Sequence, residues 1–179
     1  MIRISDDIQL IPLCLDDATD IFRILNDERE YMREWLPFVD NTHQEEDTAK
    51  AVGDMVNSSA EQFTIRYMGK LIGLIGFKDF DEVNGKIEIG YWLSQYMQGK
   101  GVMVRSVKAL IDYAFEHLGV NRIQIKVAVE NAKSNRIPVK LDFTLEGVER
   151  DGELLVDNKY TDLNIYSLLK KEYKKDGNN

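Results

Sequence analysis

The stretch Gln98-Gly99-Lys100-Gly101-Val102-Met103 is the part of this sequence best suited to chemistry. It follows an apolar run and opens a helical pattern, and its glycines let several backbone N–H groups turn toward one point. A helix N-terminus adds unsatisfied donors and a partial positive charge, an arrangement that suits a pyrophosphate. A glycine-rich connection without any ligand would have the same composition, so these residues alone leave both interpretations open.

Two common phosphate-binding motifs do not fit this stretch. In a P-loop the Gly-Lys pair is followed by Ser or Thr, whereas Gly101 follows here, and Ser94 stands where the first glycine belongs. In the dinucleotide fingerprint a third glycine is needed where this chain has Val104. A ligand of this loop is therefore expected to be held by neither of these two motifs.

A single carboxylate interrupts an apolar strand just before this stretch. In the segment 86–93, alternation places Ile87, Ile89, Tyr91 and Leu93 on one face and Glu88 with Gly90 and Trp92 on the other. A carboxylate in the middle of a core strand is costly unless it has a partner or a chemical task. Glu88 is thus either paired with a lysine or arginine across the sheet or a candidate for proton transfer.

The hydrophobic periodicity predicts the elements that position these residues. Strands are expected at 8–13, 62–67, 71–80, 86–93, 122–129, 144–150 and 159–168, and helices from 16 or 17, before 35–37, around 49–56, at 101–118 and at 131–141. Met68-Gly69-Lys70, Asn84-Gly85 and Asp151-Gly152 look like hairpin turns. The crossover through 101–118 predicts a parallel pair. The expected fold class is α/β with one mixed, mostly antiparallel sheet, a central parallel pair and helices on both faces.

Composition limits the class of protein. A chain of 179 residues with 44% hydrophobic and 30% charged residues is expected to form one domain, 1–179, with 170–179 as a solvated tail. The net charge of −8 disfavours nucleic-acid binding, and a lone Cys14 with two histidines predicts no metal site. Because the apolar run 71–77 is too short for a membrane span and no signal segment is recognisable, we expect a cytoplasmic protein without membrane contact.

The order of several motifs resembles the GNAT superfamily of N-acetyltransferases. Gln98 and Gly101 match its Gln/Arg-x-x-Gly-x-Gly/Ala motif after Ile89-Gly90-Tyr91-Trp92-Leu93, and Met103 departs at the last position. The family's Asn-x-x-Ser has its counterpart in 131–134, and its Gly-Phe pair is replaced by Asp142-Phe143. The segments 35–37 and 157–162 are similar to the subgroup of ribosomal-protein serine or alanine N-terminal acetyltransferases. The resemblance covers roughly 9–169.

This resemblance implies a coenzyme site. Acetyl-CoA would serve as co-substrate, with its pantetheine in a gap between the strands 86–93 and 122–129 and a backbone N–H near Leu93 polarising the thioester and stabilising the oxyanion. The implied cofactor-binding residues are Trp92, Leu93, Gln98, Gly99, Lys100, Gly101, Val102, Met103, Asn131 and Ser134. Lys100 could instead be solvated, and Asn131 could merely cap the helix.

It also implies catalytic candidates, namely Glu88, Ser134 and Glu153. Glu88 or Glu153 would accept the amine proton, although Glu153 also fits an exposed turn. Many members carry a tyrosine seven residues after the motif asparagine, where this chain has Pro138, so Ser134 would hydrogen-bond the sulfur or else only cap the helix. Asp162 could attract the amine but more simply fits a turn partner, and Trp35 more often belongs to a core than to an acceptor pocket.

The implied function is transfer of acetyl from acetyl-CoA directly to a primary amine, and the leading acceptor is the N-terminal α-amine of a ribosomal protein. A small amine such as a polyamine, an aminoglycoside or another drug is the second hypothesis, and a catalytically silent acyl-CoA-binding module is the third. By analogy with the subgroup, and because an exposed edge strand invites pairing, we expect a homodimer.

Overall fold

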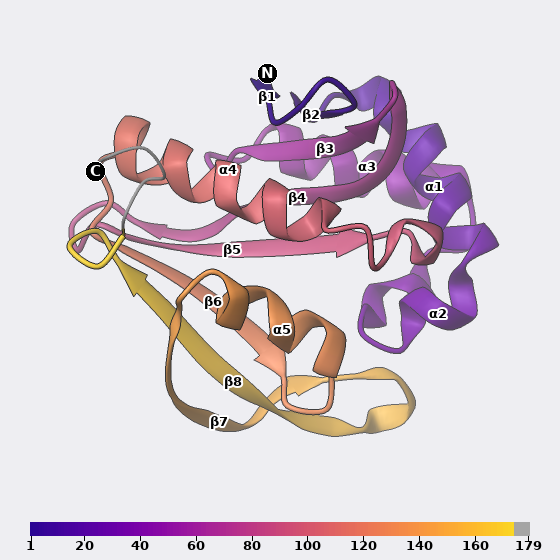
Figure 1. Ribbon diagram of the computed structural model, residues 1–179. Coiled ribbons are helices and arrows are strands. Elements are labelled where there is room, and N and C mark those ends of the chain that lie inside the picture. The colour runs from indigo at the N-terminus through magenta and orange to yellow at the C-terminus, as the bar shows by residue number, and fades with distance from the viewer. Residues whose placement is uncertain (174–179) are drawn as a thin grey trace.

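A computed structural model describes residues 1–173 of the chain (Figure 1). The strands are β1 (Ile2–Arg3), β2 (Ile8–Pro12), β3 (Gln62–Tyr67), β4 (Lys70–Asp81), β5 (Lys86–Leu93), β6 (Arg122–Ala128), β7 (Thr144–Leu154) and β8 (Tyr160–Leu169). The α-helices are α1 (Ala18–Asp27), α2 (Arg29–Arg33), α3 (Glu45–Val56), α4 (Val102–His117) and α5 (Ala132–Lys140), and the 3₁₀ turns are η1 (Leu15–Asp17), η2 (Pro37–Asn41), η3 (Gln95–Met97) and η4 (Val156–Asn158). None of these helices is long and apolar enough to cross a membrane.

All eight strands form one sheet in the order β1-β2-β3-β4-β5-β6-β8-β7. Every neighbouring pair is antiparallel except β5 and β6, which are parallel and joined by the α4 crossover. The predicted fold class is confirmed, including the central parallel pair. The turns at Met68-Gly69 and Asn84-Gly85 also occur, with left-handed backbone at Met68, Gly69 and Gly85.

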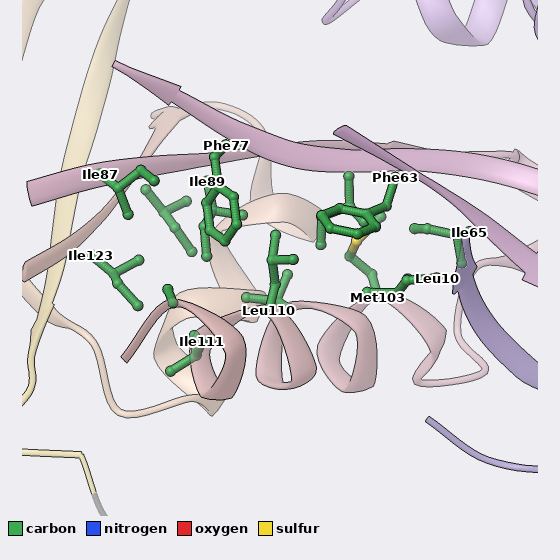
Figure 2. Close-up of a cluster of buried hydrophobic side chains, with 14 of the residues drawn as sticks. Leu10, Phe63, Ile65, Phe77, Ile87, Ile89, Met103, Leu110, Ile111 and Ile123 are labelled. Atoms are coloured by element: carbon green, nitrogen blue, oxygen red, sulfur yellow. The ribbon is translucent and has the colours of Figure 1, made fainter. Parts of the chain in front are cut away.

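The larger core lies between the sheet and α4. Figure 2 shows Met103 and Leu110 of α4 facing the strand residues, among them Phe77 and Ile89, and Ile111 belongs to the same cluster. Val107, Leu110, Ile111 and Ala114 have no exposed surface, so the apolar stripe of this helix is fully buried. The helix begins beside the end of β5, and this fixes the glycine-rich turn relative to the strand.

A second core fills the other face of the sheet. Buried side chains of α1 and α3, including Ile21, Leu25 and Val52, pack with Leu71 and Leu74 of β4, and Trp92 of β5 packs against this cluster. The helices α1, α2 and α3 therefore cover the β2–β5 half of this face. The β6–β8–β7 half of the same face carries polar side chains, among them Gln124, which accepts from Arg122, and Lys126, which donates to Glu149.

The structure corrects the predicted ends of the chain. Strand β7 continues through Asp151-Gly152 to Leu154, with irregular pairing between Glu149 and Glu153, so the hairpin turns at η4 instead. The short strand β1 was not predicted. The expected solvated tail is wrong for Tyr173, whose hydroxyl donates to Asp112 Oδ1 at 2.6 Å and whose ring packs on Phe115. The remainder of that predicted tail, 174–179, lies outside the described residues.

Candidate functional site

The site is built around a gap between the two parallel strands. β5 and β6 pair only at their starts, where the last partners are Glu88 and Gln124. Beyond this point β5 pairs only with β4 and β6 only with β8, and Figure 1 shows the two strands diverging toward their ends. The facing edges of residues 89–93 and 125–128 therefore offer backbone groups that the sheet itself does not use.

The alternation of amides along β5 identifies which groups face the gap. The Ser94 N–H donates to the Ile72 carbonyl of β4 at 2.9 Å. Successive residues of a strand direct their amides to opposite sides, so the Leu93 N–H points away from β4 and toward the gap. A carbonyl oxygen placed in the gap could accept a hydrogen bond from Leu93.

The glycine-rich turn lies directly beyond the end of β5. Gly99 and Gly101 have φ values of +73° and +69°, a left-handed conformation that side chains disfavour, and α4 begins at the next residue, Val102. Val102 and Met103 are buried in the core, so only their backbone groups can face a ligand. Because the first N–H groups of a helix lack intrahelical acceptors, this turn offers a set of donors with the chemistry that a pyrophosphate requires.

Gln98 joins the two sides of the entrance to this gap. Its side-chain amide donates to the hydroxyl of Tyr31 on α2, and its Oε1 accepts a hydrogen bond from Lys133 Nζ of α5 at 2.9 Å. Lys133 also stands over the Tyr31 ring, 5.6 Å from its centroid. The side chain of the motif glutamine thus links α2 to α5, and Lys100 is exposed with its ammonium 3.6 Å from Met97 Sδ.

The N-terminal end of α5 carries Asn131 and Ser134. Asn131 caps the helix, because its Oδ1 accepts from the Ser134 N–H at 3.1 Å. The Ser134 hydroxyl makes no cap and is hydrogen-bonded to the Tyr91 hydroxyl of β5 at 3.2 Å. Tyr91 and Ser134 lie on the α4 and α5 side of the sheet, where burial raises the pKa of the Tyr91 phenol.

Glu88 lies on the opposite side of the sheet. It is 3% exposed, forms an ion pair with Lys78 Nζ at 2.7 Å and accepts from Gln124 Nε2 at 3.1 Å. The chain of Lys78 passes over Gly90, where an added Cβ would lie 3.5 Å from the lysine Cε. Of the two alternatives for Glu88, a basic partner across the sheet or a role in proton transfer, the structure shows the partner, which is Lys78.

Glu153 belongs to the same electrostatic neighbourhood. Glu153 is exposed, as one of its two predictions stated, but it lies within β7 and not in a turn. Partial burial of its carboxyl raises the pKa of Glu153, Lys78 opposes this rise, and Glu88 adds to it. Lys78 thus acts on both predicted carboxylates, through an ion pair with Glu88 and through the effect of its charge on Glu153, whereas Ser134 lies on the other face of the sheet.

A cavity of about 340 Å³ lies beyond the carboxyl end of β6. Its walls come from α2, from the residues after β6 and from the β7–β8 turn, and the residues that line it are Glu30, Arg33, Glu34, Trp35, Glu130, Leu155, Val156, Asp157 and Lys159. Four acidic residues face two basic ones, so the lining carries a negative surplus. The prediction that Trp35 belongs to a core is wrong, because it is half-buried and lines this cavity.

Trp92 and Asp162 are two further residues with predicted roles, and the structure shows what each of them contacts. The Trp92 side chain packs against the second core, away from Tyr91 and Ser134, so the structure does not bring its indole to the glycine-rich turn. Asp162 of β8 accepts from the Asp151 N–H of β7 at 2.9 Å, so it bridges two strands where their pairing is irregular and is not a turn partner. Sequence analysis missed Tyr91, Lys78 and Gln124 as site residues. The β5 alternation already indicated the faces of Tyr91 and Glu88, but only the sheet order reveals what they contact.

Comparison with known proteins identifies the class. The model of the acetyltransferase (GNAT) domain family matches residues 7–144. The gap between parallel strands and the glycine turn before a helix fall inside this match. The chain therefore belongs to the GNAT acetyltransferase family, and it is an N-acetyltransferase.

Two sequence relatives cover almost the whole chain. YdaF of Bacillus subtilis (strain 168), provisionally named a ribosomal N-acetyltransferase, is 35% identical over 96% of this chain and 96% of its own length. The ribosomal-protein-serine acetyltransferase of Escherichia coli (strain K12) is 29% identical over 94% of this chain and 96% of its own. Both names combine acetyl transfer with the ribosome.

A solved structure adds information on the co-substrate. The microcin C7 self-immunity acetyltransferase MccE, determined in complex with acetyl-CoA and AMP, matches with a TM-score of 0.87 and 29% identity. The match covers 93% of this chain and 94% of that one. A protein of the same fold thus binds acetyl-CoA, and the donors found around the gap and the glycine turn fit such a molecule.

Proposed function

We propose that this enzyme binds acetyl-CoA in the gap between β5 and β6 and transfers the acetyl group directly to a primary amine, the N-terminal α-amine of a ribosomal protein. The observation that carries this proposal is the loss of β5–β6 pairing after Glu88 and Gln124, next to a left-handed glycine turn that opens α4. The free edges of β5 and β6 and the N–H groups at the start of α4 would then bind different parts of the same coenzyme molecule. The ribosomal acceptor is supported by the names of the two relatives.

The residues around the gap would divide the work as follows. Acetyl-CoA, when bound, supplies an acyl group activated as a thioester. The N–H groups of 98–103 hold the pyrophosphate, the side chain of Gln98 ties α2 to α5 beside it, and the Leu93 N–H polarises the acyl carbonyl. Asn131 fixes the start of α5, so that the Ser134 hydroxyl would point to the sulfur of coenzyme A from the α5 side of the sheet.

The acceptor amine would approach from the other face. The cavity lined by Trp35, Glu34 and Asp157 has a negative surplus that favours a protonated amine, and it lies beyond the carboxyl end of β6. An amine must lose a proton before it attacks. Glu153, whose pKa is raised, is better suited to accept that proton than Glu88, because Glu88 is already paired with Lys78.

The enzyme is also proposed to act as a homodimer through β7. This strand is the last in the sheet order, so one of its edges has no strand neighbour among residues 1–173. It exposes Leu145, Val148 and Leu154, at 53%, 52% and 45%. A long edge with apolar side chains is a template for a second copy.

The proposal is tested by thiol release from acetyl-CoA with a panel of amines. The panel contains peptides that begin with Ser or Ala, the same peptides with a blocked α-amine, polyamines and aminoglycosides. Turnover with the free peptides, abolished by blocking, supports the protein acceptor. Turnover with small amines alone would show that the acceptor is a small amine and not a protein. Binding of coenzyme A without turnover of any amine would contradict the proposed transfer.

A further inference from the structure

A proline inside α5 leaves Ser134 with an unusual partner. In a helix the carbonyl of residue 134 would accept from the N–H of residue 138, but Pro138 has no N–H, and α5 nevertheless continues to Lys140. The Tyr91 hydroxyl takes this place, at 3.5 Å from the Ser134 carbonyl oxygen, at the long limit of a hydrogen bond. The same hydroxyl lies 3.2 Å from Ser134 Oγ. Tyr91 therefore contacts both polar oxygens of Ser134.

The surroundings keep the Tyr91 hydroxyl neutral and fixed. The side chain lies between β5 and α5, and burial raises the pKa of its phenol, so it stays protonated and can always donate. Its neighbour Tyr166 does not compete for Ser134, because its hydroxyl donates to Asn135 Oδ1 at 2.9 Å. The Asn135 amide in turn donates to the Ala128 and Asn131 carbonyls, which anchors α5 on β6.

We propose that Tyr91 is a positioning residue for Ser134: it donates to Ser134 Oγ and so leaves the single Ser134 proton free for the sulfur of coenzyme A. Hydroxyl hydrogens rotate, so the pair can bond in either direction at 3.2 Å. Without a sulfur in the site, Ser134 donates to Tyr91 and Tyr91 to the Ser134 carbonyl. With a sulfur present, the Ser134 proton turns to the sulfur and the Tyr91 proton turns to Ser134 Oγ. When the C–S bond breaks, the Ser134 hydroxyl hydrogen-bonds the departing thiolate, and Tyr91 keeps its own proton.

The inference rests on the coenzyme site proposed above, and its test separates the two. Calorimetry measures the affinity for coenzyme A and for desulfo-coenzyme A, which lacks the sulfur, in wild type, Tyr91→Phe, Ser134→Ala and the double variant. Tyr166→Phe is the matched control, since it removes another phenol hydroxyl beneath α5 that does not touch Ser134. Thermal unfolding of each variant is recorded alongside.

We expect wild type to bind coenzyme A about 3- to 10-fold more tightly than desulfo-coenzyme A, the range of one hydrogen bond. Tyr91→Phe should lose most of this ratio while its affinity for desulfo-coenzyme A is kept, and Tyr166→Phe should retain the ratio. In the Ser134→Ala background, Tyr91→Phe should change nothing further. For acetyl transfer to whichever amine is turned over, kcat should fall in Tyr91→Phe with KM for acetyl-CoA unchanged.

Three results would overturn the inference. The first is an unchanged ratio in Tyr91→Phe, and the second is a set of effects of Tyr91→Phe and Ser134→Ala that simply add. The third result applies even if Tyr91→Phe does not fold. If Ser134→Ala keeps the wild-type ratio of affinities for coenzyme A and desulfo-coenzyme A, Ser134 does not contact the sulfur. Failure of wild type to bind either compound would refute the coenzyme site itself, and the role of Tyr91 with it.

Discussion

The chemistry of single residues in this enzyme depends on which face of the sheet they occupy. Glu88 and Tyr91 are three residues apart on β5 and lie on opposite faces, the first against Lys78 and the second against Ser134. Odd spacing in a strand guarantees this separation. The gap beyond Glu88 is the passage between the two faces, so a thioester held there could be reached from both.

We predict that Glu153→Gln removes the acid limb of the pH profile of kcat and lowers kcat on the order of 100-fold. A proton acceptor must be ionised, so wild-type activity should fall as pH drops through the raised pKa of Glu153. Lys78→Met should move this limb to higher pH, because Lys78 holds that pKa down. Initial rates across the acid range, at saturating acetyl-CoA, check both.

Glu149→Gln is the control for this measurement. Glu149 lies on the same strand, and its carboxylate is engaged by Lys126 at 3.0 Å. Its replacement should leave the shape of the profile unchanged. An acid limb that persists in Glu153→Gln would show that another group, or water, accepts the proton.

At the scale of elements, the turn between β5 and α4 depends on its backbone conformation more than on space. An added Cβ at Gly101 would meet nothing within 4 Å, so the requirement for glycine comes from its φ of +69°. Residues other than glycine adopt this region at a cost of about 1–2 kcal/mol. Relief of that cost would turn the peptide groups on either side, which are the proposed phosphate donors.

Gly101→Ala should therefore lower the affinity for coenzyme A about tenfold and the free energy of unfolding by about 1 kcal/mol. Gly147→Ala is the control, since that glycine has open space and no positive φ. Titration calorimetry and urea unfolding measure the two quantities. Equal affinities for the two variants would argue against a phosphate site at this turn.

A charged cluster ties β7 to the sheet across β8. Glu146 accepts from both terminal nitrogens of Arg122 at 2.6 Å and from Ser167 Oγ at 2.7 Å. The arginine lowers the pKa of Glu146 to about 2. A carboxyl with a lowered pKa stabilises the fold above its ordinary pKa, near 4.5, and this contribution disappears as pH falls toward about 2.

Glu146→Gln should reduce the free energy of unfolding by about 1 kcal/mol at neutral pH, a value that allows for solvent screening of the pair. The difference from wild type should shrink through the acid range. Glu130→Gln, which breaks an exposed pair with Lys159, should have almost no effect. Urea unfolding of the three proteins as a function of pH tests this, and a difference that stays constant with pH would contradict the charge-based explanation.

The whole molecule is predicted to be a dimer through the free edge of β7. Val148→Lys places a charge on that edge, as natural edge strands do to prevent pairing, and should convert the dimer to a monomer. Val83→Lys, in the β4–β5 turn where the side chain is 95% exposed, should remain dimeric. Sedimentation velocity distinguishes the two masses. A monomeric wild type, or a dimer unaffected by Val148→Lys, would rule out this interface.

The sequence by itself determined the elements and the family. Period-two alternation and turn residues predicted the strands β2 to β8, the apolar stripe of 101–118 predicted the crossover helix, and the order of motifs indicated a GNAT enzyme. The crossover helix and the family are confirmed, whereas β1 was missed and β7 runs past its predicted end. These features are local, because each depends on residues close together in the chain. The same holds for the caps and turns, such as Asn131 before α5 and Gly85 after β4.

Only the tertiary structure decided which side chains meet. Tyr91 and Ser134 are 43 positions apart in the chain, and their contact requires α5 to cross back over β5. The ion pair of Lys78 with Glu88 and the effect of the Lys78 charge on Glu153 likewise need the sheet order, and Trp35 became a cavity wall because η4 lies opposite α2. Contacts of this kind follow from how the layers pack, and periodicity in one segment carries no information about what another segment brings to it.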